Sequence, residues 1–221
     1  MTDNHADDGR ELLDAAEVRV LAVLAEKEAL TPDAYPLSLN ALIAGCNQLS
    51  SRDPVMALDE GTVRDALDRL VQKRLAAEVR QAGARVSKFE HRMRIKWTLE
   101  QDKLALLVLL MLRGAQTPGE LRGRSGRLHE FASVAEVEAS LQFLIDKYPP
   151  LVARLGRAPG TKEARYVHLL SGDEGVAQQE TASAAPVRGD RIGALESEVA
   201  ALRAEVERLS AQFETFRKQF D

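Results

Sequence analysis

The chain has 221 residues, enough for one large domain or two small ones, and 45% of them are hydrophobic. Aromatic residues make up only 5%, so any core must rest on aliphatic side chains. The formal net charge of -4 excludes a strong electrostatic attraction of the whole molecule to nucleic acid. A local basic face on the protein is still possible. The single cysteine, Cys46, excludes an intrachain disulfide, argues against a structural zinc site and favours a cytoplasmic protein.

Residues 1–11 are acidic and polar, which predicts a disordered tail and is unlike a signal peptide. Asp14 can cap the helix that follows, with Glu17 three residues later. The elements expected from hydrophobic periodicity and turn residues are helices at 13–30, 38–48 and 59–74 and strands at 75–80 and 86–99. This order of three helices and a hairpin is typical of a winged helix.

The same order recurs in the next seventy residues, as an internal repeat would require. A helix over 100–113 is stopped by Gly114, a second is capped by Thr117 and a third by Ser133. A strand, turn and strand follow over 149–170. We therefore expect a mainly α protein with small β-hairpins (α+β), in which two tandem winged-helix domains cover 12–100 and 101–170.

The C-terminal region divides into a polar linker over 171–190 and a heptad pattern over 191–221. Apolar residues alternate in steps of three and four at Ile192, Leu195, Val199, Leu202, Val206, Leu209, Phe213, Phe216 and Phe220. β-branched residues at the a positions with leucine at d favour a parallel coiled-coil homodimer. The terminal phenylalanines leave a trimer or tetramer open, and an amphipathic helix folded back on its own domain is the alternative.

The apolar run over 104–112 has nine residues, too few to span a bilayer, so no membrane partner is expected.

Several stretches resemble the YceH-like family of bacterial proteins of unknown function. They include "VRVLAVLAEKE", "TPDAYPLSLNALIAGCNQLSSRDPVM", "GARVSKFEHR", "LRGAQTPGELRGRSGRLHEF" and "APGTKEARYVHLL", and they run in order from about Leu12 to Gly172. The resemblance implies tandem winged-helix domains and brings no established reaction, ligand or DNA site. The chain departs from the family pattern at Leu49 and Ser51, where lysine and asparagine are usual.

Charge is segregated along the first domain. Residues 61–100 carry ten basic and five acidic side chains, whereas residues 1–35 carry three basic and nine acidic ones. The candidate DNA-binding residues are Arg64, Arg69 and Lys73 on the third helix and Arg85, Lys88, Arg92 and Arg94 on the hairpin. The same helix also carries Asp65 and Asp68. The alternative interpretation is therefore that this helix face is exposed to solvent and stabilised by Arg/Asp pairs.

The function expected from this pattern is DNA binding, with transcriptional control as its purpose. The alternative is a protein-interaction scaffold, in which the winged-helix domains contact another protein and the coiled coil sets the stoichiometry. The second domain is the poorer DNA reader, because its third helix exposes acids and its arginines, Arg122, Arg124 and Arg127, come earlier.

Catalytic chemistry is not expected from the sequence: no cofactor, metal or enzymatic activity is predicted. Cys46 lies in an apolar helix and is expected to be a buried side chain rather than a nucleophile. Asn40 and Asn47 share a helix face and, with Tyr35 and Arg52, could line a small polar pocket. Capping and loop hydrogen bonds are the alternative for these residues.

Overall fold

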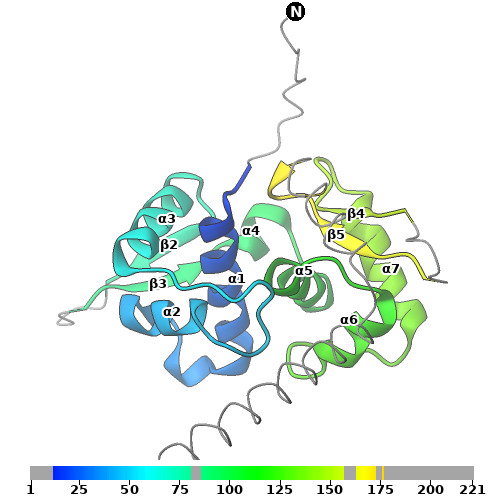
Figure 1. The fold of residues 1–221 in the computed structure, drawn as a ribbon, viewed down its shortest axis with the longest axis horizontal. Helices are drawn as coiled ribbons and strands as arrows, with labels where there is room; N and C mark the ends of the chain where they lie inside the picture. The colour runs from blue at the N-terminus through cyan, green and yellow to red at the C-terminus, as the bar shows by residue number, and fades with distance from the viewer. Residues whose placement is uncertain (1–11, 81–85, 157–162, 173–175, 177–221) are drawn as a thin grey trace, which may run out of the picture. The chain divides into compact units, whose positions relative to one another are not determined.

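A computed structural model describes residues 12–80, 86–156, 163–172 and 176 (Figure 1). These residues form an α+β protein with seven α-helices and two small antiparallel sheets. The predicted tail, most of the linker, the heptad segment 191–221 and Arg85 lie outside them, so their predicted roles stay predictions.

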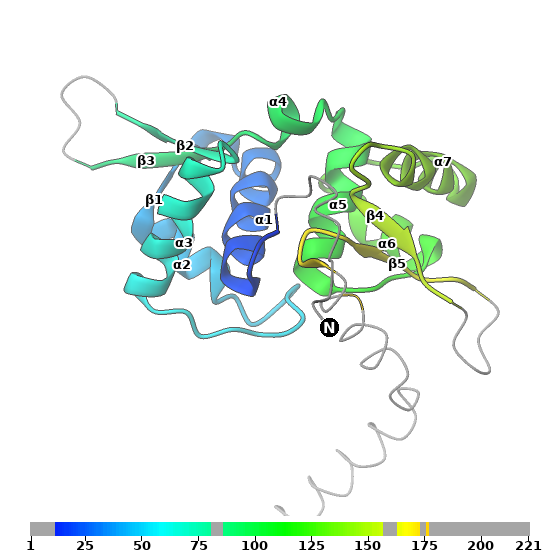
Figure 2. The same ribbon diagram turned by 90° about the horizontal axis from the view of Figure 1, so that it is seen from above.

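The first half contains three helices, a short strand between the first two, and a hairpin. The elements are α1 (Ala15–Leu30), a 3-10 turn (Pro32–Ala34), β1 (Leu37–Ser38), α2 (Leu39–Cys46), α3 (Glu60–Gln72), β2 (Ala76–Val79) and β3 (Lys88–His91). The sheet has the order β1-β3-β2, and Ala76 pairs with His91 at its inner end. The hairpin of β2 and β3 extends beyond the helices (Figure 2).

The second half repeats the three helices and the hairpin. After the connecting helix α4 (Met93–Trp97) come α5 (Gln101–Arg113), α6 (Pro118–Ser125), α7 (Val134–Ile145), β4 (Val152–Arg154) and β5 (Tyr166–His168). Gln116, between α5 and α6, forms an isolated bridge with Tyr166 of the last strand. It occupies the place in this half that β1 holds in the first.

Local caps place the helix starts where the sequence predicts them. Asp14 and Thr117 each form a reciprocal capping box, with Glu17 and Glu120. Ser133 accepts a hydrogen bond from the Glu136 amide, but the Glu136 carboxylate turns to the amide of Ala132. Side-chain caps satisfy amide groups that no intrahelical carbonyl can reach, and this fixes the first turn.

The strand predicted over 86–99 is wrong beyond His91. Its partner β2 begins at Ala76, so no ladder is available past the Ala76–His91 pair. The chain instead donates one hydrogen bond from Arg92 N to Leu75 O and turns into α4. Thr98 then ends this helix with a left-handed backbone (φ 50°).

One core runs through both halves. Helix α1 packs against α3 on one side and against α5 on another, and the two long helices lie next to each other in both ribbon views (Figures 1 and 2). Every residue of α5 from Leu104 to Leu112 is buried. A helix that is apolar on all sides must be covered on all sides, so α5 serves as the centre of the core rather than as the edge of a separate domain.

A close helix contact makes Gly45 sensitive to substitution. A Cβ atom at this position of α2 would lie 2.6 Å from Cγ1 of the buried Val23 in α1. Overpacking of this kind costs about 1–3 kcal/mol, more than the roughly 1 kcal/mol that alanine gains over glycine in a helix.

We therefore expect Gly45→Ala to lower the free energy of unfolding in urea, and Gly45→Ala with Val23→Ala to lose less than the two single losses added. Gly123→Ala is the control, because nothing lies within 4 Å of its added Cβ in helix α6. It should be neutral or stabilising, and a Gly45→Ala protein as stable as the original would contradict the contact.

Candidate functional site

Helix α3 and its C-cap, Lys73, provide three of the predicted DNA-binding residues. Asp59 caps α3 by accepting a hydrogen bond from Thr62 N. The buried face of the helix consists of Val63, Ala66, Leu67 and Leu70. Arg64 lies on the outside and forms an ion pair with Glu60 at 2.6 Å. Both side chains are more than half exposed, so the pair contributes little and Arg64 is available to a partner.

Arg69 and Lys73 face the start of α1 instead. Arg69 Nη2 lies 2.6 Å from Asp14, and Lys73 Nζ lies 2.7 Å from Glu17, whose side chain is only 3% exposed. Lys73 also donates to the carbonyl oxygen of Leu12. These cations neutralise the almost buried carboxylate of Glu17. If they turned to a phosphate, that carboxylate would stay buried without a positive partner, which is energetically costly.

The hairpin carries the next two predicted residues. Lys88 begins β3 and is partly exposed, and Arg92 follows the strand and pairs with Glu90 at 2.7 Å. Arg80, at the outer end of β2, is 78% exposed and pairs with Glu78. The hydrogen bonds and charge of Glu78 raise the pKa of Arg80, so it is a permanent cation on the hairpin.

Arg94, predicted to lie in a strand of the hairpin, lies in α4 and points back into the protein. Its guanidinium donates to Glu28 at 3.2 Å and also contacts Gln101 at the start of α5. Glu28 in turn lies 3.1 Å from His91 Nε2, and the His91 ring is buried. The hydrogen bond from His91 and the charge of Arg94 outweigh burial and hold the pKa of Glu28 below its ordinary value.

The two charge blocks of the sequence thus meet in space. Residues 12–100 contain thirteen basic and thirteen acidic side chains. The N-cap and two acids of α1 form ion pairs with Arg69, Lys73 and Arg94. The outward face of α3 consists of exposed residues that include one base and three acids: Arg64, Glu60, Asp65 and Asp68. A helix with this face meets a phosphate backbone with net repulsion.

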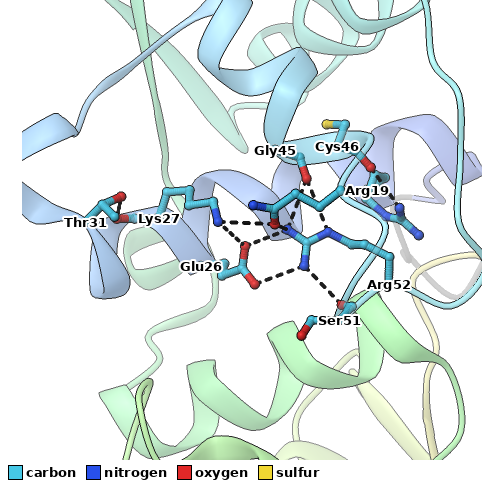
Figure 3. Close-up of polar contacts among 9 residues, drawn as sticks. Arg19, Glu26, Lys27, Thr31, Gly45, Cys46, Ser51 and Arg52 are labelled. Atoms are coloured by element: carbon cyan, nitrogen blue, oxygen red, sulfur yellow. Dashed lines mark hydrogen bonds and ion pairs between the residues drawn. The ribbon is translucent and has the colours of Figure 1, made fainter.

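The most elaborate polar cluster of the described residues surrounds Arg52, in the loop between α2 and α3 (Figure 3). The Arg52 side chain is 0% exposed and forms a two-pronged ion pair with Glu26 of α1, at 2.6 and 3.0 Å. It also donates to Gly45 O, Ser51 O and the Gln48 side chain. Burial raises the pKa of Glu26, but hydrogen bonds and charge from Arg52 outweigh it, so the net pKa lies below the ordinary value.

A second buried arginine holds the same loop. Arg19 of α1 donates to the carbonyl oxygens of Cys46 and Pro54, and Asp53 N donates to Leu112 O of α5. The cluster therefore joins α1, α2 and α5 to a loop that leaves Leu49 84% exposed. Turn-forming residues predicted this loop, but nothing in the local pattern indicated that Arg52 or Arg19 would be buried.

The polar pocket suggested for Asn40, Asn47, Tyr35 and Arg52 is not formed. Asn47 is occupied by the backbone of Leu58, with one hydrogen bond to its amide and one to its carbonyl. Tyr35 Oη accepts from His91 N, on the hairpin side of the fold. The loop-bonding alternative is the right one for Asn47.

Helix α7 occupies in the second half the place that α3 holds in the first, and its exposed residues include an apolar stripe beside Glu136, Glu138 and Gln142. Ala135, Ala139 and Phe143 lie one turn apart and are exposed, with Val134 beside them. Lys103 and Lys147 each lie 5.2 Å from the Phe143 ring centroid, at the end of this stripe. The stripe itself presents no basic side chain to a phosphate.

Metal or nucleophilic chemistry finds no support among the described residues. They contain no group of three His, Cys, Asp or Glu side chains placed to hold a metal ion. Cys46 is buried as predicted, and burial raises the pKa of its thiol to about 12, which keeps it protonated. No helix within the described ranges is long and apolar enough to cross a membrane.

These features define a class: an α+β protein of two repeated helix-and-hairpin halves around one core, with a charge-balanced first half. Residues 13–161 match the model of a family described as "Protein of unknown function, DUF480". The chain is also 65% identical over 216 residues to a UPF0502 protein of Herminiimonas arsenicoxydans, covering 95% of this chain and 91% of that one. UPF0502 proteins of Azoarcus (57% identity; 95% and 94% covered) and Geobacter sulfurreducens (48%; 95% and 99%) are similar over most of their length.

The chain therefore belongs to this DUF480 family of unknown function, which is consistent with the YceH-like resemblance of the sequence.

Proposed function

We propose that this chain is a tandem winged-helix protein that acts by binding other proteins, without catalysis or cofactor, in the cytoplasm. The winged-helix assignment is supported by the repeated element order and by the β1-β3-β2 sheet, in which a short strand after the first helix pairs with the last strand of the hairpin. The Gln116–Tyr166 bridge supports the same arrangement in the second half. The heptad segment 191–221 would set the stoichiometry by self-association.

The observation that carries the proposal is the chemistry of the third helix in each half. In a winged helix that reads DNA, this helix supplies the donors and cations that enter the major groove. Here α3 turns Arg69 and Lys73 toward α1 and presents acids outward. Helix α7 presents an apolar stripe beside the exposed acids Glu136 and Glu138, and this mixed surface suits a protein partner better than a phosphate backbone; the stripe consists of Val134, Ala135, Ala139 and Phe143.

The test is site-directed photocrosslinking in the bacterium that makes the protein. A photoreactive phenylalanine analogue at exposed Ala139 should give one dominant adduct of defined mass, and that adduct should disappear when Val134→Glu is added. The analogue at Gln72, exposed at the end of α3, is the control and should not give the same adduct. If Ala139 gives no adduct, or if the adduct persists with Val134→Glu, the proposed α7 surface is wrong.

A second candidate, DNA binding through the phosphate backbone alone, is favoured by the hairpin. It extends beyond the helices (Figure 2) and carries Lys88 and Arg92, and Arg85 lies between its two strands in the sequence. Fluorescence anisotropy with a mixed-sequence duplex at low and moderate salt tests it. Affinity that falls steeply with salt and weakens in Arg85→Ala/Lys88→Ala would support DNA binding, and no binding at low salt would reject it. Arg64→Ala should then change the affinity little, because this model does not use α3.

A further inference from the structure

Strand β2 forms an open edge of the first sheet. The strand order is β1-β3-β2, so β2 pairs with β3 on one side and with no described strand on the other. The hairpin of β2 and β3 extends beyond the helices (Figure 2), and Glu78 and Arg80, toward the outer end of β2, are exposed. An open edge accepts a further strand, because its outward amide and carbonyl groups are unpaired in the sheet.

The hydrogen bonds at the base of the hairpin show how its ladder alternates. Arg92 N donates to Leu75 O, so these two residues form a hydrogen-bonded pair next to Ala76–His91. His91 N donates to Tyr35 Oη instead of to β2. Hydrogen-bonded and non-hydrogen-bonded pairs alternate along an antiparallel ladder. The pairs between β2 and β3 therefore alternate outward from this point.

This alternation decides which backbone groups face the open edge. Ala77 and Val79 fall on the hydrogen-bonded positions, so their amide and carbonyl groups are used by β3. Those of Glu78, between them, point away from β3 to the open edge. The groups of Arg80 do the same once the strand continues by one residue.

The exposed charges of this edge are self-complementary. Glu78 and Arg80 form an ion pair with each other at 3.0 Å, and the side chain of Arg80 is 78% exposed. An edge that carries charges of one sign repels a second copy of itself. One acid and one base, two residues apart, attract an antiparallel second copy, because each acid then lies opposite the base of the other copy.

We propose that two copies of this chain pair through the open edge of β2, antiparallel about a two-fold axis between their Val79 residues. In this register Glu78 of each copy lies opposite Arg80 of the other, and both residues turn their backbone groups to the shared edge. The two Val79 side chains meet across a non-hydrogen-bonded pair, where side chains approach most closely. The two sheets become one, with the order β1-β3-β2-β2-β3-β1.

Other registers fit the edge less well. A shift by one residue places Glu78 opposite Val79, so outward backbone groups meet groups that β3 already uses. A shift by two residues places Glu78 opposite Glu78, or Arg80 opposite Arg80, and like charges directly opposite each other are destabilising. The pairing does not use the α7 stripe and does not depend on the protein-binding proposal.

Disulfide trapping tests the register directly. Opposite residues of a non-hydrogen-bonded pair have Cα atoms about 4.5 Å apart, within the range of about 4.4–6.8 Å that disulfides span. Full-length Val79→Cys should therefore form a disulfide-linked dimer under mild oxidation. Cys46 does not compete, because it is buried and burial raises the pKa of its thiol to about 12.

Ala77→Cys is the matched control. Ala77 lies on the same strand and is half-buried like Val79. In the proposed register the two Ala77 residues are offset along the strands by about 13 Å, too far for a disulfide. Ala77→Cys should therefore link about ten-fold more slowly or not at all. The comparison also corrects for encounters between copies that another part of the chain holds together.

Charge reversal tests which residues lie opposite each other. Arg80→Glu, added to Val79→Cys, places Glu78 opposite a second acid and should slow the disulfide roughly five-fold or more. Glu78→Arg together with Arg80→Glu exchanges the two charges and should recover the rate. Urea unfolding checks that each variant is folded.

Three results would each overturn the proposal: no linked dimer from Val79→Cys, equally fast linking of Ala77→Cys, or a slow rate that persists in the charge-exchanged protein. The first of these would leave the edge of β2 to a strand of a different protein.

Discussion

Replacing Arg52 with methionine is expected to lower the free energy of unfolding by about 3–5 kcal/mol near neutral pH. Methionine has a similar volume but leaves the Glu26 carboxylate, only 8% exposed, without its two-pronged partner. It also removes the donors to Ser51 O and to the carbonyl oxygen of the buried Gly45. Urea unfolding followed by circular dichroism measures the change.

Two further variants test whether the loss of stability comes from the unpaired charge of Glu26. Arg64→Met makes the same substitution in an ion pair that is more than half exposed, and it should cost no more than about 0.5 kcal/mol. Arg52→Met with Glu26→Leu removes both charges and should recover a large part of the loss. If the double variant were as unstable as Arg52→Met, the lost hydrogen bonds to the loop would be the main cause of the lower free energy of unfolding.

The loss in Arg52→Met should also shrink as the pH falls. In the original protein the pKa of Glu26 lies below its ordinary value, so its stabilising effect is present above the unfolded pKa of about 4.3 and is lost only below it. Without Arg52, burial is the largest remaining influence on Glu26 and raises its pKa, opposed only by the contact with Lys27, so proton uptake then favours the folded state. The difference in stability between the two proteins should therefore be smaller at about pH 5 than at about pH 7, and a constant difference would contradict this account.

The parts of the fold that the sequence predicts are those set by neighbouring residues. The caps at Asp14, Thr117 and Ser133 depend on side chains that reach amides three residues away. Gly114 ends α5 with a positive φ of 70°, as its glycine suggested. By contrast, β3 ends at His91 because its partner β2 begins at Ala76, opposite His91, and the length of a partner strand is not visible in the sequence of β3 itself.

The acidic partners of the candidate DNA-binding residues could not be predicted from the sequence for a related reason. Counting charges along the chain separated an acidic block from a basic one, but the fold brings α1 against α3 and α4, so Glu17 meets Lys73 and Glu28 meets Arg94. These partners are 56 and 66 residues apart. A local sequence pattern predicts on which face of a helix a basic residue lies. It does not predict which acidic residue lies opposite once the helices pack.

Leu107→Ala is expected to lower the stability of both halves together, by about 2–5 kcal/mol. Leu107 is completely buried in α5, and this helix packs against α1 of the first half and against α6 and α7 of the second. Because the core is continuous, unfolding of one half would expose the apolar surface of α5 that the other half covers. The two halves should therefore unfold in one cooperative transition despite their repeated element order.

Native-state hydrogen exchange measures this directly, because it reports the opening free energy of individual amides. The slowest amides of α3 in the first half and of α7 in the second should have similar opening free energies in the original protein, and Leu107→Ala should reduce both by the same amount. The surface change Gln142→Ala, on exposed α7, serves as the control and should leave both within about 0.5 kcal/mol. If Leu107→Ala loosened α7 while α3 kept its protection, the halves would be independent domains, and a chain ending at Glu100 should then fold alone.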